Sequence, residues 1–163
     1  MRAGKGRIAL LELFSGQGAI TKAVVARGCK AVSHDLPQGD LALGSVQRRI
    51  IRAVRAGEYR HVHLAPPCSS FSVAYYGRFR TNGCTRSADR PEGDGSVARE
   101  VLGNKLAHFS ARVIDACWAS NTTFSLENLL TSMIWRIPAL AIRIAREEVR
   151  RVRLDFCAFG APF

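Results

Sequence analysis

No apolar run in this sequence of 163 residues approaches the length of a membrane-spanning helix, so we expect no transmembrane segment. The basic start of the chain precedes an apolar run, as in secretory signals, but Glu12 interrupts that run and a glycine-rich turn ends it. The sequence also lacks a CxxC pair and any histidine spacing typical of zinc, so we expect no metal site. Its five cysteines are widely spread and odd in number, which favours reduced thiols and an intracellular location, in cytoplasm or nucleus.

Acidic residues are scarce, because 13 Asp and Glu stand against 24 Lys and Arg, which gives a formal net charge of +11. Such an excess raises the affinity for phosphate whatever the fold, so nucleic acid is the first expected partner and an acidic membrane surface the second. The alternative is that the excess of positive charge has no specific partner and only keeps the protein soluble. With 47% hydrophobic residues and no repeat, low-complexity tract or linker, the chain is predicted to form one domain over residues 1–163.

The hydrophobic pattern alternates between strand-like and helix-like stretches, which predicts an α/β fold with a mostly parallel sheet. A strand, a turn and a helix follow one another over residues 8–27, and a second short strand completes the opening of a βαβ unit. Further on, Val46, Ile50 and Val54 share one helical face while arginines occupy the others. The predicted strands, in the sheet order 3-2-1-4-5, cover residues 8–14, 30–33, 59–65, 123–126 and 149–156.

Chemically distinctive residues follow three of these predicted strands. Pro66 and Pro67 end the third strand, because proline cannot continue a hydrogen-bonded ladder, and Cys68 comes directly after them. Glu127 and Asn128 follow the fourth strand, and a glycine turn follows the first. Right-handed crossovers bring the carboxyl ends of parallel strands to one edge, so we expect these groups to share a cleft with Cys68 placed like a nucleophile. The alternative is that Cys68 is an inert core thiol.

Residues 73–95 lose the periodic pattern and are rich in Gly, Ser, Thr, Asn and Arg, which predicts a flexible basic loop. Arginines and aromatic residues are interleaved there, which favours a nucleic-acid contact because rings stack on bases while arginine holds phosphates. A solvated mobile loop is the alternative. The arginines concerned are Arg78, Arg80, Arg86 and Arg90.

The glycine turn over residues 15–18 lets the backbone approach a ligand closely, and Asp35, beyond the second strand, is placed to accept hydrogen bonds from a ribose. A dinucleotide fingerprint has a third glycine where Thr21 stands. The absence of that glycine argues against a nicotinamide or flavin and leaves an adenosine-bearing cofactor without a pyrophosphate.

Three segments resemble the motifs of the cytosine-5 DNA methyltransferase family and occur in that family's order. They are Phe14-Ser15-Gly16-Gln17-Gly18, Pro66-Pro67-Cys68-Ser69-Ser70-Phe71-Ser72 and Glu127-Asn128. Residues 155–162 are also similar to the family's segment that runs from the fifth strand to a Gly-x-Pro. The resemblance covers the chain from residue 8 onward and implies a Rossmann-like, S-adenosylmethionine-dependent methyltransferase core.

The resemblance implies methyl transfer from S-adenosylmethionine to carbon 5 of cytosine in DNA, with no membrane partner. Cys68 would add to carbon 6 of the ring as a thiolate, and Glu127, kept protonated by a dry pocket, would act as the acid near ring nitrogen 3. The target base would be flipped out of the duplex. The implied cofactor residues are Phe14, Gly16, Gly18, Asp35 and Asp40, and the implied substrate residues are Pro67, Ser72, Asn128, Arg78 and Arg80.

The chain departs from the family after the fifth predicted strand. No Gln-x-Arg-x-Arg motif, closing strand pair or target-recognition region follows, so the family's C-terminal strands are expected to be missing. The fifth strand would then be an apolar edge, which favours pairing. We therefore expect a truncated product, a minimal variant or a chain completed by another, C-terminal polypeptide. Two functional alternatives stay open, namely a catalytically silent nucleic-acid-binding domain and methylation of cytosine in RNA.

Overall fold

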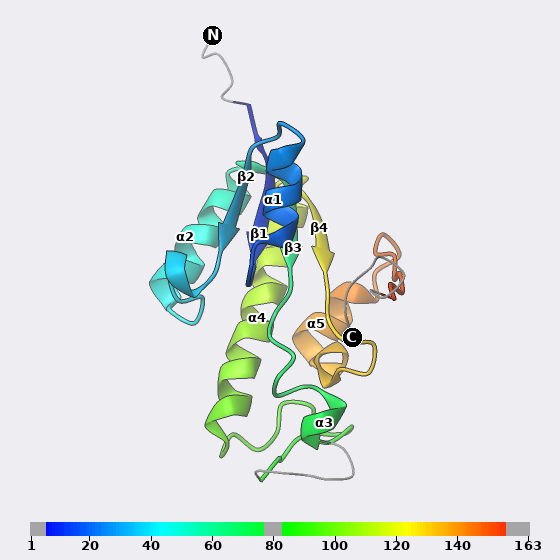
Figure 1. The fold of residues 1–163 in the computed structure, drawn as a ribbon. Coiled ribbons are helices and arrows are strands. Elements are labelled where there is room, and N and C mark those ends of the chain that lie inside the picture. Colours follow the sequence, from blue (N-terminus) through cyan, green and yellow to red (C-terminus); the bar gives the residue numbers. More distant parts are fainter. Residues whose placement is uncertain (1–5, 77–82, 156–163) are drawn as a thin grey trace.

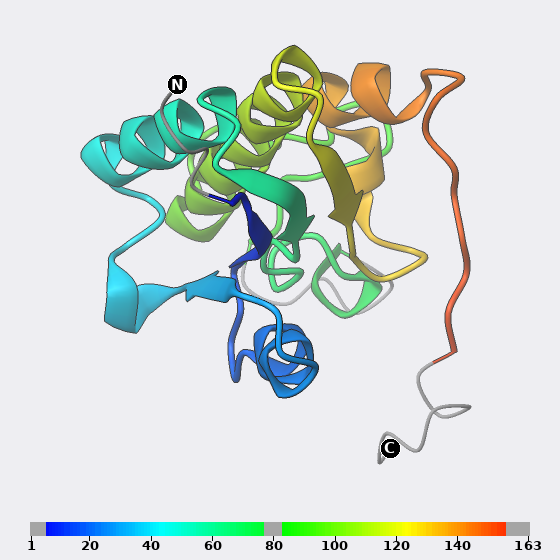
Figure 2. The same cartoon turned by 90° about the horizontal axis from the view of Figure 1, so that it is seen from above.

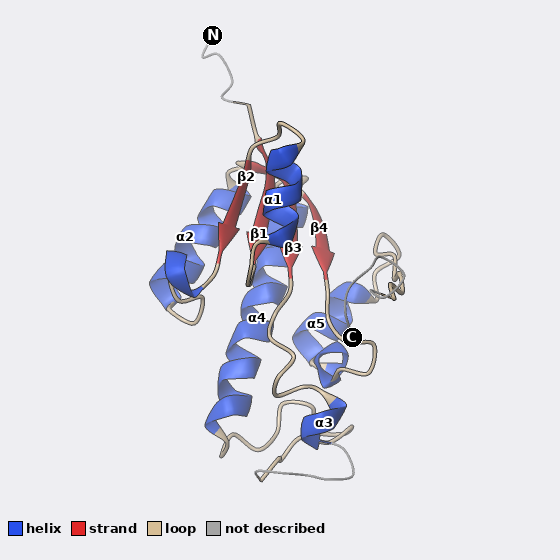
Figure 3. Cartoon of the chain, in the orientation of Figure 1, coloured by secondary structure: helices blue, strands red, loops and turns tan. Residues whose placement is uncertain are grey.

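The computed structural model describes residues 6–76 and 83–155. Within these ranges four parallel strands form one sheet in the order β2-β1-β3-β4 (Figure 1 and Figure 3). The strands are β1 (Ile8–Leu13), β2 (Ala31–His34), β3 (Tyr59–Leu64) and β4 (Thr123–Leu126). The protein therefore has the predicted α/β fold with a parallel sheet.

Helices cover both faces of the sheet (Figure 2). On one face α1 (Ala19–Ala26) packs against β1 and β2, and on the other lie α2 (Gly44–Arg55), α4 (Ala98–Ala119) and α5 (Pro138–Ile144). The units β1-α1-β2 and β2-α2-β3 run in opposite directions along the sheet, so right-handed crossovers place α1 and α2 on opposite faces. The short helical segments are η1 (Leu36–Gln38), α3 (Val73–Tyr76) and η2 (Met133–Arg136).

The predicted strand order 3-2-1-4-5 is wrong. It placed the third strand outside the second, whereas β3 pairs with β1 from Ile8 opposite Tyr59 to Leu13 opposite Leu64. β2 has only four residues, of which one is buried, so it offers little apolar surface to a further neighbour and forms the edge. β3 carries the fully buried Val62 and Leu64, and it obtains that burial between β1 and β4.

The described part of the predicted fifth strand, residues 149–155, forms no strand, so this prediction is also wrong there. Val152 is 72% exposed and Leu154 is 60% exposed, and no strand among the described residues pairs with the segment. Val152 and Leu154 alternate with arginines and would share one face of a strand, but no element among the described residues buries that face. The rest of the stretch that is similar to the methyltransferase family, residues 156–162, lies outside the described residues.

The hydrophobic core lies between the sheet and the helices α2, α4 and α5. Leu13 of β1, Leu64 of β3 and Phe109 of α4 are all fully buried in this cluster. In α2 the arginines are exposed whereas Ile50 and Val54 are buried, as the helical pattern predicted. Across the described ranges, no helix combines the length and the apolar character needed to cross a bilayer.

A polar network lies on the opposite face of β3 and β4. His61 and His63 alternate with the buried residues of β3, so their side chains point away from the core. His61 Nδ1 lies 2.8 Å from Thr123 Oγ1. Ser125 Oγ lies 2.9 Å from His61 Nε2 and 2.8 Å from His63 Nδ1. Burial lowers the pKa of both histidines below the ordinary 6.5.

Because of these histidines, we expect the free energy of unfolding to fall as the pH is lowered from about 7.5 to about 5.5. Between the lowered pKa of the folded state and 6.5, the unfolded chain binds more protons than the folded chain. Stability therefore rises with pH in that window and is lost as the pH falls through it. Urea unfolding at each pH measures the slope, which should be shallower for His61→Asn/His63→Asn than for the exposed control His108→Asn. Equal slopes in the two variants would contradict the assignment.

Candidate active site

The residues that follow the four strands lie side by side at one edge of the sheet, the lower edge in Figure 1. Backbone hydrogen bonds continue just past the strands. Phe14 N donates to His34 O at 3.0 Å, Ala65 N to Leu13 O at 3.3 Å, and Glu127 N to Leu64 O at 2.8 Å. Neighbouring strands are about 4.8 Å apart, so the row from β2 to β4 spans roughly 14 Å. The sheet thus collects the predicted chemical groups at its carboxyl edge.

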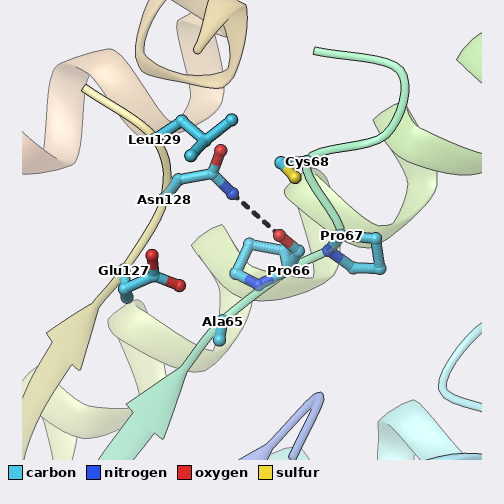
Figure 4. Close-up of a pocket in the computed structure, with 7 residues that line it drawn as sticks. All are labelled: Ala65, Pro66, Pro67, Cys68, Glu127, Asn128 and Leu129. Atoms are coloured by element: carbon cyan, nitrogen blue, oxygen red, sulfur yellow. Dashed lines mark hydrogen bonds between the residues drawn. The ribbon is translucent and has the colours of Figure 1, made fainter. Parts of the chain in front are cut away.

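A pocket of about 190 Å³ opens between the loop after β3 and the loop after β4 (Figure 4). Four of the predicted catalytic and substrate residues line it, namely Cys68, Glu127, Pro67 and Asn128. The remaining lining residues are Ala65, Pro66 and Leu129. Cys68 and Glu127 lie on opposite walls of the pocket, which is the juxtaposition that the strand ends predicted.

A hydrogen bond joins the two walls of the pocket. Asn128 Nδ2 donates to the carbonyl oxygen of Pro66 at 2.8 Å. The Asn128 Oδ1 atom is buried and has no hydrogen-bond partner among the described residues. Leaving a buried acceptor unpaired costs roughly 1–3 kcal/mol, so a turn of the Asn128 amide that brought this oxygen to a donor would be stabilising.

The two titratable side chains of the pocket differ in their surroundings. Glu127 is half-buried, and burial raises the pKa of its carboxyl group above the ordinary value. This carboxyl group holds a proton to a higher pH than an exposed glutamate does. Cys68 is a free, half-buried thiol, so a reagent or substrate in the pocket can reach it. The pocket therefore brings together a carboxyl group of raised pKa and a free thiol, which are the types of group that can serve as proton donor and nucleophile.

The glycine turn follows β1 and contacts Asp35, which follows β2. Phe14, Gly16 and Gly18 all have positive φ angles, of 60°, 51° and 65°. Gly16 N donates to Asp35 Oδ2 at 2.6 Å, and the space in which a Cβ of Gly16 would stand is empty within 4 Å. The turn therefore presents open space next to a carboxylate. None of these residues lines the pocket of Cys68, and so they form a second part of the same edge.

The other predicted residues lie away from the pocket or outside the described chain. Asp40 Oδ1 accepts a hydrogen bond from Ala42 N at 2.7 Å, so it stabilises the turn before α2. The Ser72 carbonyl accepts from the last two residues of α3, Tyr75 N at 2.9 Å and Tyr76 N at 3.3 Å. Neither residue lines the pocket. Arg78 and Arg80 lie outside the described residues.

Arg86 is a buried structural residue, and its placement among the nucleic-acid contacts is wrong. It is 1% exposed, and its guanidinium carbon lies 4.0 Å from the centre of the Phe71 ring. It donates to Ser70 Oγ at 3.1 Å, to Glu100 O at 3.0 Å and to Asn104 Oδ1 at 2.8 Å. The sequence pattern suggested exposure because charged side chains are rarely buried without partners, and these partners are distant in the sequence.

The Arg86 contacts support the loop that carries Cys68. Phe71 N donates to Cys68 O at 2.8 Å, and Phe71 O accepts from Met133 N at 2.8 Å. α4 approaches this loop closely at Gly103, where a Cβ would overlap Ser70 Oγ and lie 3.1 Å from Arg86 Nη2. A glycine inside a long helical pattern was the one sequence signal for such a close approach.

Among the described residues, no group of three or more His, Cys, Asp or Glu side chains is placed to hold a metal ion. The candidate site therefore consists of the pocket around Cys68 and Glu127 and the neighbouring glycine turn with Asp35. No family model, no curated protein and no solved structure matches this chain.

Proposed function

We propose that the protein has a Rossmann-like methyltransferase core and transfers a methyl group from S-adenosylmethionine to carbon 5 of cytosine in DNA. The observation that carries the proposal is the convergence of Cys68 and Glu127 on one pocket from two different strand ends. The resemblance of the motifs to cytosine-5 DNA methyltransferases and the net charge of +11 support it.

The chemistry needs a nucleophile and an acid, because carbon 5 of cytosine does not attack a methyl donor unaided. The Cys68 thiolate forms a bond to carbon 6, and Glu127 gives its proton to ring nitrogen 3 as the electrons move into the ring. Carbon 5 would then take the methyl group, and the donor would leave as S-adenosylhomocysteine when its sulfur–methyl bond breaks. Loss of the carbon 5 proton to solvent expels the Cys68 thiolate, and Glu127 recovers its proton.

The glycine turn and Asp35 fit the adenosine end of the cofactor. Open space beside Gly16 allows a close approach, and the Asp35 carboxylate next to it can accept hydrogen bonds from ribose hydroxyl groups. S-adenosylmethionine supplies the methyl group when it is bound. Phe14 and Gly18 shape the turn, whereas the role proposed for Asp40 near the adenine lacks a contact that supports it.

The unpaired Asn128 Oδ1 would gain a partner if the amide turned toward a substrate that carries a donor. The exocyclic amine of cytosine is such a donor, and a base has to leave the duplex to bring it into the pocket. Cytosine in RNA presents the same ring, so RNA is the alternative substrate. A catalytically silent nucleic-acid-binding domain is the alternative without chemistry.

The test is a covalent trap with DNA that contains 5-fluorocytosine. Fluorine at carbon 5 cannot leave as a proton does, so the Cys68 adduct should persist and give a denaturation-resistant protein–DNA band that requires S-adenosylmethionine. We expect the band to vanish in Cys68→Ser and to remain in Cys29→Ser, because Cys29 is an exposed thiol outside the pocket. A matched RNA oligonucleotide tests the alternative substrate. DNA binding without any adduct would instead favour the silent domain.

A further inference from the structure

A second concave surface lies at the opposite, amino edge of the sheet. This surface has a volume of about 310 Å³ and is lined by three cationic residues, Arg7, Lys30 and Arg60. The other lining residues are small, namely Gly6, Ala9 and Cys29. The surface therefore combines positive charge with room for an anionic group between the side chains.

The parallel topology accounts for this cluster. Arg7 precedes β1, Lys30 precedes β2 and Arg60 lies at the start of β3, so three neighbouring strands begin with a cation at one edge. Arg7 is held in place, because its Nη2 atom donates to Thr122 Oγ1 at 2.7 Å and to Tyr59 O. The fold thus positions charges from distant parts of the sequence.

The charges of this surface are not neutralised within the described part of the chain. None of Arg7, Lys30 and Arg60 forms an ion pair with a carboxylate there. The last turn of α2, which leads into β3 at the same edge, carries two more basic residues, Arg52 and Arg55, outside the lining. Cations that converge without an acidic partner attract an anion with several oxygens, such as phosphate.

We propose that this amino-edge surface binds the phosphodiester backbone of nucleic acid, independently of the pocket around Cys68. β1 has six residues, and a rise of about 3.3 Å per residue puts the two edges roughly 20 Å apart. Phosphate contacts at the amino edge, roughly 20 Å from the pocket, would hold the nucleic acid by its backbone. Such contacts do not recognise the base sequence. The lining lacks large apolar side chains, which argues against insertion into an acidic membrane.

The test compares two double variants that remove the same charge. Lys30→Gln/Arg60→Gln changes two exposed side chains of the surface, and Arg150→Gln/Arg151→Gln changes two exposed side chains elsewhere. Affinity for a labelled duplex of about 20 base pairs is measured by anisotropy over a range of salt concentrations without cofactor. The logarithm of the affinity falls linearly with the logarithm of the salt concentration, and each lost phosphate contact makes this slope shallower by about 0.9. The slope of the first variant should therefore be shallower by about 1.8, and that of the second should change clearly less.

Three outcomes would overturn the proposal. Equal losses in both variants would indicate a bulk charge effect, and an unchanged slope in the first variant would place the contact elsewhere. Tight binding of acidic vesicles that is lost in the same variant, without any loss of DNA affinity, would identify a membrane surface.

The exchange Lys30→Arg/Arg60→Lys keeps the charge and should keep the slope, which controls for folding. The assay contains no cofactor and measures binding alone, so its result is separate from that of the covalent trap.

Discussion

Replacement of Arg86 by methionine is expected to lower the free energy of unfolding by about 3–5 kcal/mol. Methionine fills much of the space but offers no donors, so Ser70 Oγ and the carbonyl of Glu100 lose their partner in a buried environment. The Glu100 carboxylate, which is fully buried, also loses a nearby positive charge. Urea unfolding measures the change through the midpoint of denaturation.

The electrostatic surroundings of Glu100 explain why this effect should be large. Burial alone would raise the pKa of Glu100, but hydrogen bonds from Thr85 and the charge of Arg86 together lower it. The group is therefore ionised in the folded protein at neutral pH. The control Arg90→Met removes an exposed arginine of the same loop and should change stability by less than about 1 kcal/mol. A similar small loss for Arg86→Met would show that the buried network contributes little.

The substitution Glu127→Gln is expected to reduce the rate of methyl transfer by about 10²–10⁴-fold. Glutamine keeps the shape of the pocket wall but has no proton to give to ring nitrogen 3. DNA affinity should stay close to that of the unchanged protein, since the ring is only one part of the bound strand. The measurement is transfer of labelled methyl groups to DNA in single turnover, with Glu58→Gln as an exposed control.

The pH dependence separates an acid role of Glu127 from a merely structural one. Burial raises its pKa, so the protonated fraction persists at a higher pH than for an ordinary glutamate and falls as the pH rises through the raised value. The single-turnover rate of methyl transfer should therefore decrease as the pH rises above that pKa. Glu127→Gln should lose that dependence. A variant with the full rate and an unchanged pH profile would contradict the proposed role.

Local sequence signals predicted which residues meet at the pocket better than they predicted the order of the sheet. Two consecutive prolines end β3, and Glu127 directly follows β4, so the meeting of Cys68 and Glu127 needed only parallel strands and a shared edge. The position of β3 beside β1 depends on which neighbour buries Val62 and Leu64. That choice is made by tertiary packing and leaves no trace in the periodicity of a single strand.

The roles of charged residues were harder to predict than those of apolar ones. Ile50 and Val54 are buried as their helical spacing indicated. Arg86 lies in a stretch of polar residues that has the composition of an exposed loop, and only its contacts with α4 show that it is buried. Composition describes the average behaviour of arginine, whereas the location of this one depends on partners from another element.

The bond between Asn128 and Pro66 has a consequence for the width of the pocket. Together with the bond from Met133 N to Phe71 O, it links the loop after β3 to the chain after β4 on both sides of Cys68. Any widening of the gap between the two loops would require at least one of these bonds to break. The width of the pocket is thus held by one bond from a side chain and one between main-chain groups, which clamp the Cys68 loop from either side.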